Sequence, residues 1–246
     1  DNNYLTLAPD SLINFSIAFY QDKKDNEKLG EALFYKGRMY NDAYQYENAT
    51  KLYMLALDNL EGSTNYDLLA KVYSDLGRIS VIQNEFEKAL GKFHKAVFYA
   101  SKTNNNKNVL KEKINIANVY RFEKKFDKAH LIYNEVFSNS TDSIISGLVL
   151  QEIGVAFFWE NVYDSTIYYL KKSLDYPFVD INKSVRLYVL ADAYYELLKL
   201  DSALFYAHKS LTYPATFHTK RACSRILANS CYLKKYFKTT PEYMTP

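Results

Sequence analysis

One phrase of this sequence is written twice, 37 residues apart, and looser copies of it come before both. The two most similar copies are YDSTIYYLKKSLDYP at 163–177 and LDSALFYAHKSLTYP at 200–214. The looser copies are YENATKLYMLAL at 46–57, FEKALGKFHKAV at 86–97 and FDKAHLIYNEVF at 126–137. Repetition at a period of about 20 to 50 residues is typical of folds in which each copy packs only on its neighbours. The chain is therefore expected to fold as a repeat array.

Small residues give the register of this repeat. The fourth place of each phrase is small, with steps of 40, 40, 37 and 37, at Ala49, Ala89, Ala129, Thr166 and Ala203. Twelve residues earlier stand Gly37, Gly77, Ala117, Gly154 and Ala191, and Ala228 follows Ala191 after another 37 residues. Seven residues after the first set stand Ala56, Ala96, Val136, Ser173 and Ser210. Large residues keep offsets of 3 and 4 from the small ones, so each copy is predicted to be two amphipathic helices whose backbones cross at the small residues.

Composition agrees with a folded and mostly helical chain. Of 246 residues 48% are hydrophobic, and only 7 are Gly and 5 are Pro. The net charge of +3 is too small to indicate a nucleic-acid or membrane-surface binder. The most apolar run, 144–159, contains Gln151 and Glu152 and is shorter than a bilayer span, so no transmembrane segment is predicted. Cys223 and Cys231 would lie about 12 Å apart on one helix, too far to form a disulfide with each other.

At this point the residues resemble the tetratricopeptide repeat (TPR) family, whose pattern runs G-x2-Y, Ala, an aromatic residue, Ala and Pro. The resemblance covers roughly residues 30–235 and implies an all-α fold, a right-handed α-solenoid of antiparallel helix pairs known as the TPR superhelix. One solenoid domain over 1–246 is expected. Its parts are a half repeat at 9–26 that resembles a lone second helix, repeats at about 30–64, 70–105, 110–141, 147–180 and 184–215, and a lone first helix at 216–237. The steps exceed the family's length of about 34 residues, and the extra length is expected near 103–108 and 139–143.

No enzyme site is visible in the sequence. Its 4 histidines are dispersed, at His94, His130, His208 and His218. The motifs of metalloproteases, nucleotide-binding loops and paired-cysteine metal sites are absent. The chain is therefore not expected to be an enzyme or to carry a cofactor or metal.

The resemblance places ligand binding on the concave face, which the first helix of each repeat would line. Helical stripe positions there are cationic in the first three repeats and apolar or aromatic in the last two, where Trp159 joins them. The predicted ligand-binding residues are Arg38, Lys71, Arg78, Lys111, Asn118, Arg121, Phe158, Trp159, Tyr188 and Tyr195. An acidic-then-aromatic peptide would suit such a groove. The chaperone-binding subfamily has Lys and Asn where this sequence has Phe34 and Arg38, so its particular partner is not expected.

The phrasing of the repeats is similar to TPR arrays of anaerobic Gram-negative bacteria, which are often extracytoplasmic and lipid-anchored or joined to a regulatory domain. This resemblance implies a non-enzymatic protein- or peptide-binding scaffold or sensor, part of a bacterial signalling or envelope protein. The expected location is the periplasm or outer envelope, with any membrane attachment outside this chain, and a cytoplasmic location stays open. The alternative is a glycan-binding TPR lipoprotein of a nutrient-uptake system, although the long insertions of such proteins are missing. A nucleic-acid reader is not expected, because the charge is near neutral.

Overall fold

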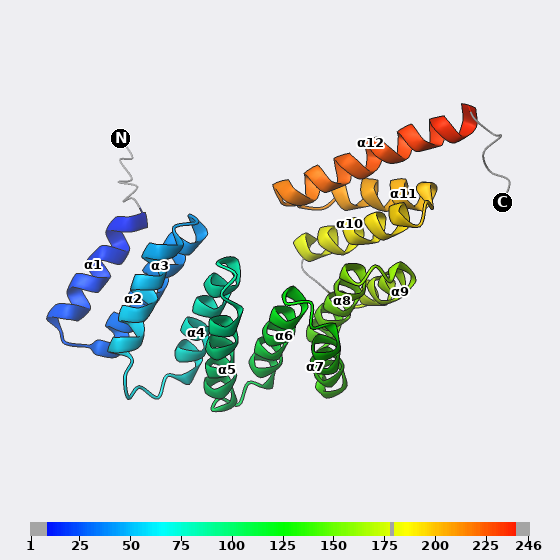
Figure 1. Ribbon diagram of the computed structural model, residues 1–246. Coiled ribbons are helices and arrows are strands. Elements are labelled where there is room, and N and C mark those ends of the chain that lie inside the picture. Colours follow the sequence, from blue (N-terminus) through cyan, green and yellow to red (C-terminus); the bar gives the residue numbers. More distant parts are fainter. Residues whose placement is uncertain (1–8, 178–179, 240–246) are drawn as a thin grey trace, which may run out of the picture. The chain divides into compact units, whose positions relative to one another are not determined.

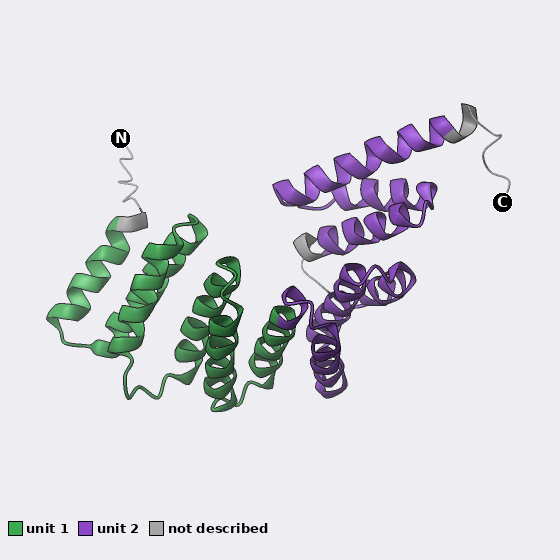
Figure 2. Ribbon diagram, viewed as in Figure 1, with its two compact units in different colours: residues 1–119 green, residues 120–246 purple. Residues whose placement is uncertain are grey.

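The computed structural model of the chain describes residues 9–177 and 180–239, and all regular structure in those residues is helical (Figure 1). The helices are α1 (Pro9–Asp22), α2 (Asn26–Asp42), α3 (Tyr46–Asn59), α4 (Tyr66–Ile82), α5 (Phe86–Ser101), α6 (Asn106–Phe122), α7 (Phe126–Asn139), α8 (Ser143–Trp159), α9 (Tyr163–Ser173), α10 (Asp180–Glu196), α11 (Leu200–Leu211) and α12 (Phe217–Thr239). The chain divides into two compact units, unit 1 with residues 1–119 and unit 2 with residues 120–246 (Figure 2). Within each unit, helices adjacent in the sequence pack on one another, most extensively α2 with α3, α4 with α5, α8 with α9 and α10 with α11.

The predicted repeat register is confirmed by the packing inside these pairs. The small residues of the second helices, Ala49, Ala89, Ala129, Thr166 and Ala203, are all 0% exposed. A Cβ atom added to Gly37 would lie 2.6 Å from the ring of Tyr53, and one added to Gly77 would lie 2.7 Å from the ring of Phe93. Large side chains of the second helices thus occupy the space that the missing side chains of the first helices leave free.

The last small site of the pattern behaves differently. Ala228, on α12, is exposed, whereas Ala191 one repeat earlier is 0% exposed. Ala191 is covered because α10 packs against α11. No described helix follows α12, so nothing in the described residues covers Ala228.

The turn inside each repeat has one constant geometry. The helices α2, α4, α6, α8 and α10 are each 17 residues long, and three residues join each to the next helix. The middle residue of the turn has positive φ and is Tyr44, Asn84, Lys124, Asn161 or Leu198. In the first of these turns the amide of Tyr44 donates to the carbonyl of Asn41, and the amide of Gln45 donates to that of Tyr40. This pair of bonds is the Schellman motif, which satisfies carbonyls left free at a helix C-terminus.

The same three-residue turn also joins α1 to α2, with positive φ at Lys24. A first helix is joined to its partner in this way in every other copy, whereas α3 and α4 are joined by the longer segment 60–65. The described helix α1 is therefore joined to α2 by the turn that follows first helices, and the lone second helix expected at 9–26 stays a prediction.

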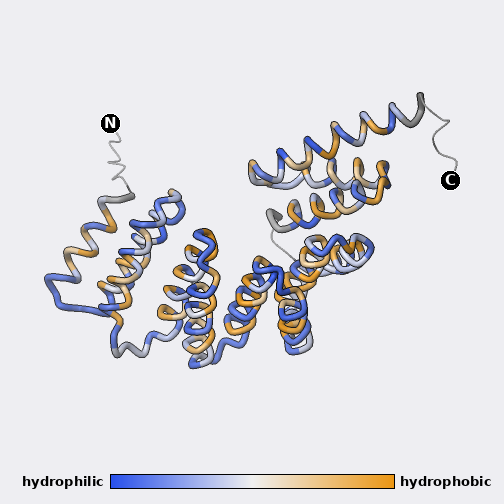
Figure 3. Tube along the Cα trace, in the orientation of Figure 1, coloured by the Kyte–Doolittle hydropathy of each residue, from blue (hydrophilic) through white to orange (hydrophobic). Residues whose placement is uncertain are grey.

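Each unit has its own apolar core. In unit 1 the core gathers around Phe34, Tyr53, Val72 and Leu76, and in unit 2 around residues of α9 to α12 such as Leu190. Hydrophobic and hydrophilic residues alternate along the helices, as expected for helices with one face buried (Figure 3). In the part of the chain that the structure describes, no helix has the length and apolarity to cross a membrane.

Candidate functional site

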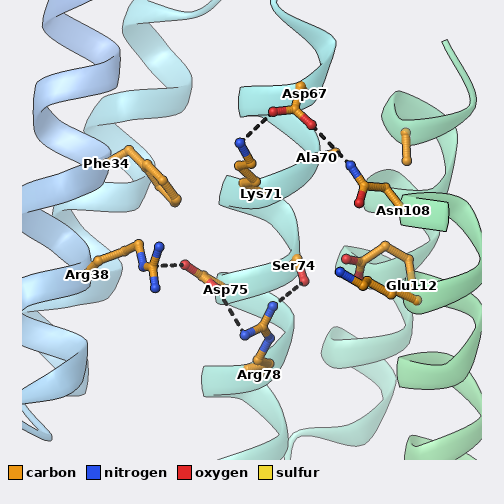
Figure 4. A pocket seen from close by; sticks show the side chains of 12 residues that line it. Phe34, Arg38, Asp67, Ala70, Lys71, Ser74, Asp75, Arg78, Asn108 and Glu112 are labelled. Atoms are coloured by element: carbon orange, nitrogen blue, oxygen red, sulfur yellow. Dashed lines mark hydrogen bonds and ion pairs between the residues drawn. The ribbon is translucent and has the colours of Figure 1, made fainter. Parts of the chain in front are cut away.

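A groove of about 220 Å³ opens in unit 1, and we call it the unit 1 groove. Figure 4 shows that α2, α4 and α6 supply the labelled side chains, with the residues of α4 in the middle, and one further lining residue, Ala100, belongs to α5. The helices α2, α4 and α6 are the first helices of three successive repeats, so each contributes the same face to the groove. Its lining residues are Phe34, Arg38, Asp67, Ala70, Lys71, Ser74, Asp75, Arg78, Ala100, Asn108, Lys111 and Glu112.

Asp75 lies at the centre of this groove between two arginines (Figure 4). Its carboxylate is 3.9 Å from Nε of Arg38 and 3.5 Å from Nη1 of Arg78, and the hydroxyl of Tyr53 donates to it at 3.4 Å. The Asp75 side chain is 12% exposed, and burial raises the pKa of its carboxyl, against the lowering effect of Arg78 and Arg38. Asp75 therefore holds both guanidinium groups at one place, although neither contact is short.

A second carboxylate links two of the helices. Asp67 on α4 pairs with Nζ of Lys71 at 2.5 Å, and Nδ2 of Asn108 on α6 donates to it at 3.2 Å. The neighbouring Glu112 is 9% exposed and accepts a hydrogen bond from Nδ2 of Asn115 at 2.9 Å. Burial raises the pKa of Glu112. Lys111, beside it, is exposed and completes the lining on the α6 side.

The structure brings together four of the predicted site residues, Arg38, Lys71, Arg78 and Lys111, in this groove. Asn118, also on α6, is half-buried and does not line it. The three carboxylates of the lining were not predicted, so the expected cationic wall is a groove of mixed charge with four cations and three anions. A signal for two of them exists in the sequence, since Asp67 precedes Lys71 by four residues and Asp75 precedes Arg78 by three, the spacings of helical ion pairs.

Arg121 differs from the expectation of an exposed cation. It is 6% exposed, and its Nη2 lies 3.4 Å from a carboxylate oxygen of Glu152. Its guanidinium also lies over the rings of Phe122 and Trp159, at 4.7 and 5.2 Å from their centroids. These neighbours take the guanidinium out of solvent, so Arg121 contributes no wet cationic surface in unit 2.

The predicted aromatic residues of unit 2 fall into two environments. Trp159 is 44% exposed and meets Phe122 edge to face at 5.6 Å, and Phe158 and Tyr195 pack as half-buried residues against the unit 2 core. Tyr188 instead lines a separate groove of about 490 Å³, which we call the unit 2 groove. Its lining residues are Tyr188, Asp192, His218, Arg221, Ala222 and Arg225.

The residues of α12 in this groove were not predicted as a site, although the repeat pattern contains a signal for them. Counting the stripe positions from Ala228, as in the other copies, gives Ala222 and Arg225 as the second and fifth positions of a sixth copy. Tyr188 and Asp192 are the fifth and ninth positions of the copy before it. Among the residues that the structure describes, no group of His, Cys, Asp and Glu is arranged to hold a metal ion.

No protein-family model matches the sequence, and no curated protein sequence matches it. Solved structures do match. The quorum sensor NprR from B. thuringiensis aligns with a TM-score of 0.67 and 13% identity over 96% of this chain and 72% of that one. BtubC (BKLC) from P. vanneervenii aligns with a TM-score of 0.65 and 17% identity over 82% of this chain and 88% of that one. A kinesin light chain from P. anserina, with nearly identical TPR-like repeats, aligns with a TM-score of 0.56 and 13% identity over 74% of this chain and 92% of that one.

At these identities the likeness is one of fold. The fold is all-α and of the TPR solenoid class, as the sequence pattern predicts. The two grooves are surfaces on helices of that fold. Apart from Ala100 of α5, the unit 1 groove is lined by first helices, and the unit 2 groove is lined by α10 and α12.

Proposed function

We propose that this chain is a non-enzymatic binding module for proteins or peptides and that the unit 1 groove contacts the ligand. The observation that carries the proposal is the state of its two arginines. The side chains of Arg38 and Arg78 are 53% and 60% exposed, and their only ion-pair partner among the described residues is Asp75, at 3.9 and 3.5 Å. Guanidinium groups that are held in place but not saturated are well suited to bind a carboxylate from a partner.

The balance of charge in this groove favours an acidic peptide segment. Four cations face three carboxylates, so a single acidic side chain of the ligand would neutralise the groove. Arg38 and Arg78 stand on either side of Asp75, on α2 and α4, and a ligand carboxylate near both would replace part of their long contact with Asp75 (Figure 4). The carboxylate of Asp67 provides an acceptor for a peptide N–H at the other end of the groove.

A solved structure supports the peptide part of this proposal by analogy. NprR has been solved in complex with its cognate peptide NprX, and that structure aligns with a TM-score of 0.61 and 14% identity over 96% of this chain and 76% of that one. A fold of this class thus accommodates a peptide in that protein. The proposal for this chain rests on its own groove residues, because the sequence identity is too low to transfer a site.

The proposal includes a bacterial signalling or envelope setting, with the periplasm or outer envelope as the location. The support for this part is the resemblance of the repeats to extracytoplasmic arrays. Fractionation of the source cells tests it independently of binding, since recovery of the protein in the cytosolic fraction would contradict the location and leave the groove proposal standing.

Binding to an array of acidic and neutral peptides tests the groove. We expect Arg78→Gln and Lys111→Gln each to weaken binding of acidic peptides about fivefold or more, and added salt to weaken binding by the parent chain. Lys88→Gln is the matched control, because Lys88 is a cation of unit 1 on α5 that pairs with Glu85 and lies outside the groove. Equal losses with the control and the groove variants, or no preference for acidic peptides, would refute the proposal.

A further inference from the structure

The unit 2 groove combines an aromatic wall with a basic helix face. Tyr188 and Asp192 come from α10, and His218, Arg221, Ala222 and Arg225 come from the first half of α12. The three basic residues are spaced at i, i+3 and i+7, which places them on one face of the helix. The groove volume of about 490 Å³ is within the range of sites that hold small ligands or a few side chains.

One of the two arginines is fixed and the other is unpaired. Nη2 of Arg225 donates to both carboxylate oxygens of Asp192, at 2.9 and 3.1 Å, and the Arg225 side chain remains 50% exposed. In the described part of the chain its other guanidinium nitrogens have no hydrogen-bond partner. Arg221 is exposed and takes part in no hydrogen bond or ion pair with the described residues. Two guanidinium groups about one helical turn apart therefore share a groove with a single carboxylate.

An apolar surface lies next to these charges. Tyr188 is half-buried against the unit 2 core, and its ring meets His218 edge to face with centroids 6.2 Å apart. Ala222 lines the groove between the two arginines in the sequence and leaves room beside them because its side chain is small. A ligand bound here would touch an aromatic ring and two guanidinium groups at once.

The basic residues of the unit 2 groove lie at and after the start of α12. The first turn of α12 contains no acidic residue, and His218, Lys220 and Arg221 lie at or next to it. The N-terminus of a helix carries a partial positive charge, so cations there are unfavourable. The helices α6 and α8 likewise have no acidic residue in the first turn, whereas such a residue is present in α2, α3, α4, α5, α7, α9 and α11.

We propose that the unit 2 groove is a second peptide-binding site, specific for a carboxylate side chain adjacent to an aromatic side chain. The carboxylate binds Arg221 and Arg225, and the aromatic ring packs on Tyr188. A single carboxylate matches the charge, because two guanidinium groups and Asp192 leave one net positive charge. The sequence pattern places the residues for a ligand carboxylate and those for a ligand aromatic ring in different repeats. In our proposal the unit 2 groove binds both ligand groups. The proposal does not depend on the unit 1 groove.

A titration of the full chain with acetyl-GDFG-amide, followed by amide chemical shifts in NMR spectra, tests the site. We expect shifts at Tyr188 and along the first half of α12. Arg221→Gln raises the dissociation constant about tenfold, because it removes a charge-assisted hydrogen bond. Lys220→Gln is the matched control, since it changes the same charge on the preceding residue, which is exposed and does not line the groove. It changes the dissociation constant less than about twofold, because a cation that makes no direct contact acts only through a screened field.

The ligand chemistry is tested with three altered peptides. Acetyl-GNFG-amide lacks the charge and acetyl-GDAG-amide lacks the ring, and each binds the parent chain at least about fivefold more weakly. Tighter binding of the phosphotyrosine peptide acetyl-GpYG-amide, lost in Arg221→Gln, would overturn the carboxylate assignment in favour of phosphate.

Two outcomes would overturn the site itself. One is equal weakening by Arg221→Gln and Lys220→Gln, which would indicate nothing beyond general attraction to a basic helix. The other is an unchanged dissociation constant in Arg221→Gln.

Arg78→Gln, in unit 1, serves as a further control: it leaves the shifts at Tyr188 and along α12 unaltered, whatever it changes in unit 1, so failure of the unit 1 groove and failure of this site are distinguishable. Arg221 makes no hydrogen bond or ion pair with the described residues, so we expect its variant to keep the melting temperature of the parent, which verifies that the fold is intact.

Discussion

Two glycines of unit 1 lie in opposite environments although both are inside helices. Gly77 on α4 is in close contact with Phe93, which is 1% exposed, and an added Cβ would lie 2.7 Å from the ring. Gly91 on α5 is exposed, and an added Cβ would meet nothing within 4 Å. The same substitution therefore has opposite consequences at the two positions.

We expect Gly77→Ala to lower the free energy of unfolding by about 1–3 kcal/mol, because the new methyl group overpacks a buried contact. Gly91→Ala raises it by about 0.5–1 kcal/mol, because alanine restricts the unfolded chain and favours the helix. Urea unfolding of both variants and the parent measures the two values. A Gly77→Ala variant as stable as the parent would show that the helix crossing at this site is looser than the structure has it.

The buried Glu112 makes a contribution to stability that depends on pH. Burial raises its pKa above the ordinary value of 4.5, so the folded chain binds this proton more tightly than the unfolded chain does. The contribution of Glu112 to the free energy of unfolding therefore falls as pH rises from about 4.5 through the higher pKa of the folded chain. Glutamine does not titrate, so the Glu112→Gln variant does not lose this stability. We expect the free energy of unfolding of the variant, relative to that of the parent, to be higher at about pH 7 than at about pH 4.

Glu47 provides the control for this effect. A hydrogen bond from Lys51 lowers the pKa of Glu47, so its ionised form stabilises the folded chain and that stability is lost as pH falls. Glu47→Gln should thus show a pH trend of opposite sign, small because the site is exposed. Urea unfolding at the two pH values measures both trends, and a Glu112→Gln difference that does not change with pH would contradict the assigned cause.

At the scale of the helices, several turns place a residue other than glycine or asparagine in the left-handed backbone region. Among the described residues, six non-glycine residues have positive φ, two of them asparagines, and the one glycine with positive φ is Gly62. Leu198 has φ of 54° and is 59% exposed, so its side chain gains little from the position. A branched side chain in the left-handed region costs free energy that glycine does not.

We expect Leu198→Gly to raise the free energy of unfolding by about 1 kcal/mol, because it relieves this strain at the C-terminus of α10. Asn161→Gly at the equivalent turn after α8 gains less, since asparagine tolerates the left-handed region better than leucine. Thermal or urea unfolding compares the two variants with the parent. A loss of stability in Leu198→Gly would mean that the leucine side chain contributes more than its exposure indicates.

At the scale of the whole chain, helices pack on near neighbours in the sequence within two compact units. Stability in such folds is approximately a sum of local terms. We expect Gly77→Ala to reduce hydrogen-exchange protection mainly in α2 to α5, and Gly154→Ala, whose Cβ would lie 2.7 Å from Leu170, mainly in α8 to α11. Equal loss of protection in both units with either variant would instead indicate one cooperative transition.

The repeat register could be predicted from the sequence because it depends on contacts inside one helix pair. Small residues such as Gly77 and Ala89 recur at fixed spacing, since backbones that approach closely leave no room for larger ones. The four cations of the unit 1 groove stand at stripe positions that the resemblance to TPR proteins assigns to the concave face. The charges that modify them do not follow from the resemblance, because burial of Asp75 and Glu112 depends on packing between repeats rather than within one.

The environments of the other candidate site residues depend on residues far away in the sequence. Arg121 is buried because Glu152, 31 residues away, and Trp159 surround it, and periodicity carries no information about such pairs. The predicted stripe covers five copies, and the basic face of α12 belongs to a sixth copy beyond them. Asp192, which fixes Arg225 there, lies 33 residues earlier in the chain.

The first helices have a constant length, whereas other parts of the repeat do not. From α2 to α11, each first helix and its turn occupy 20 residues, whereas the second helices range from 11 to 16 residues and the segments that follow them vary too. The differences in length between the copies thus fall on the second helices and the segments after them, and the spacing of the stripe positions is the same in each of these first helices. If the first helices carry the ligand contacts, as we propose, a point substitution there changes recognition without changing the length of the repeat, and a change of length in the rest of the repeat leaves those contacts in register.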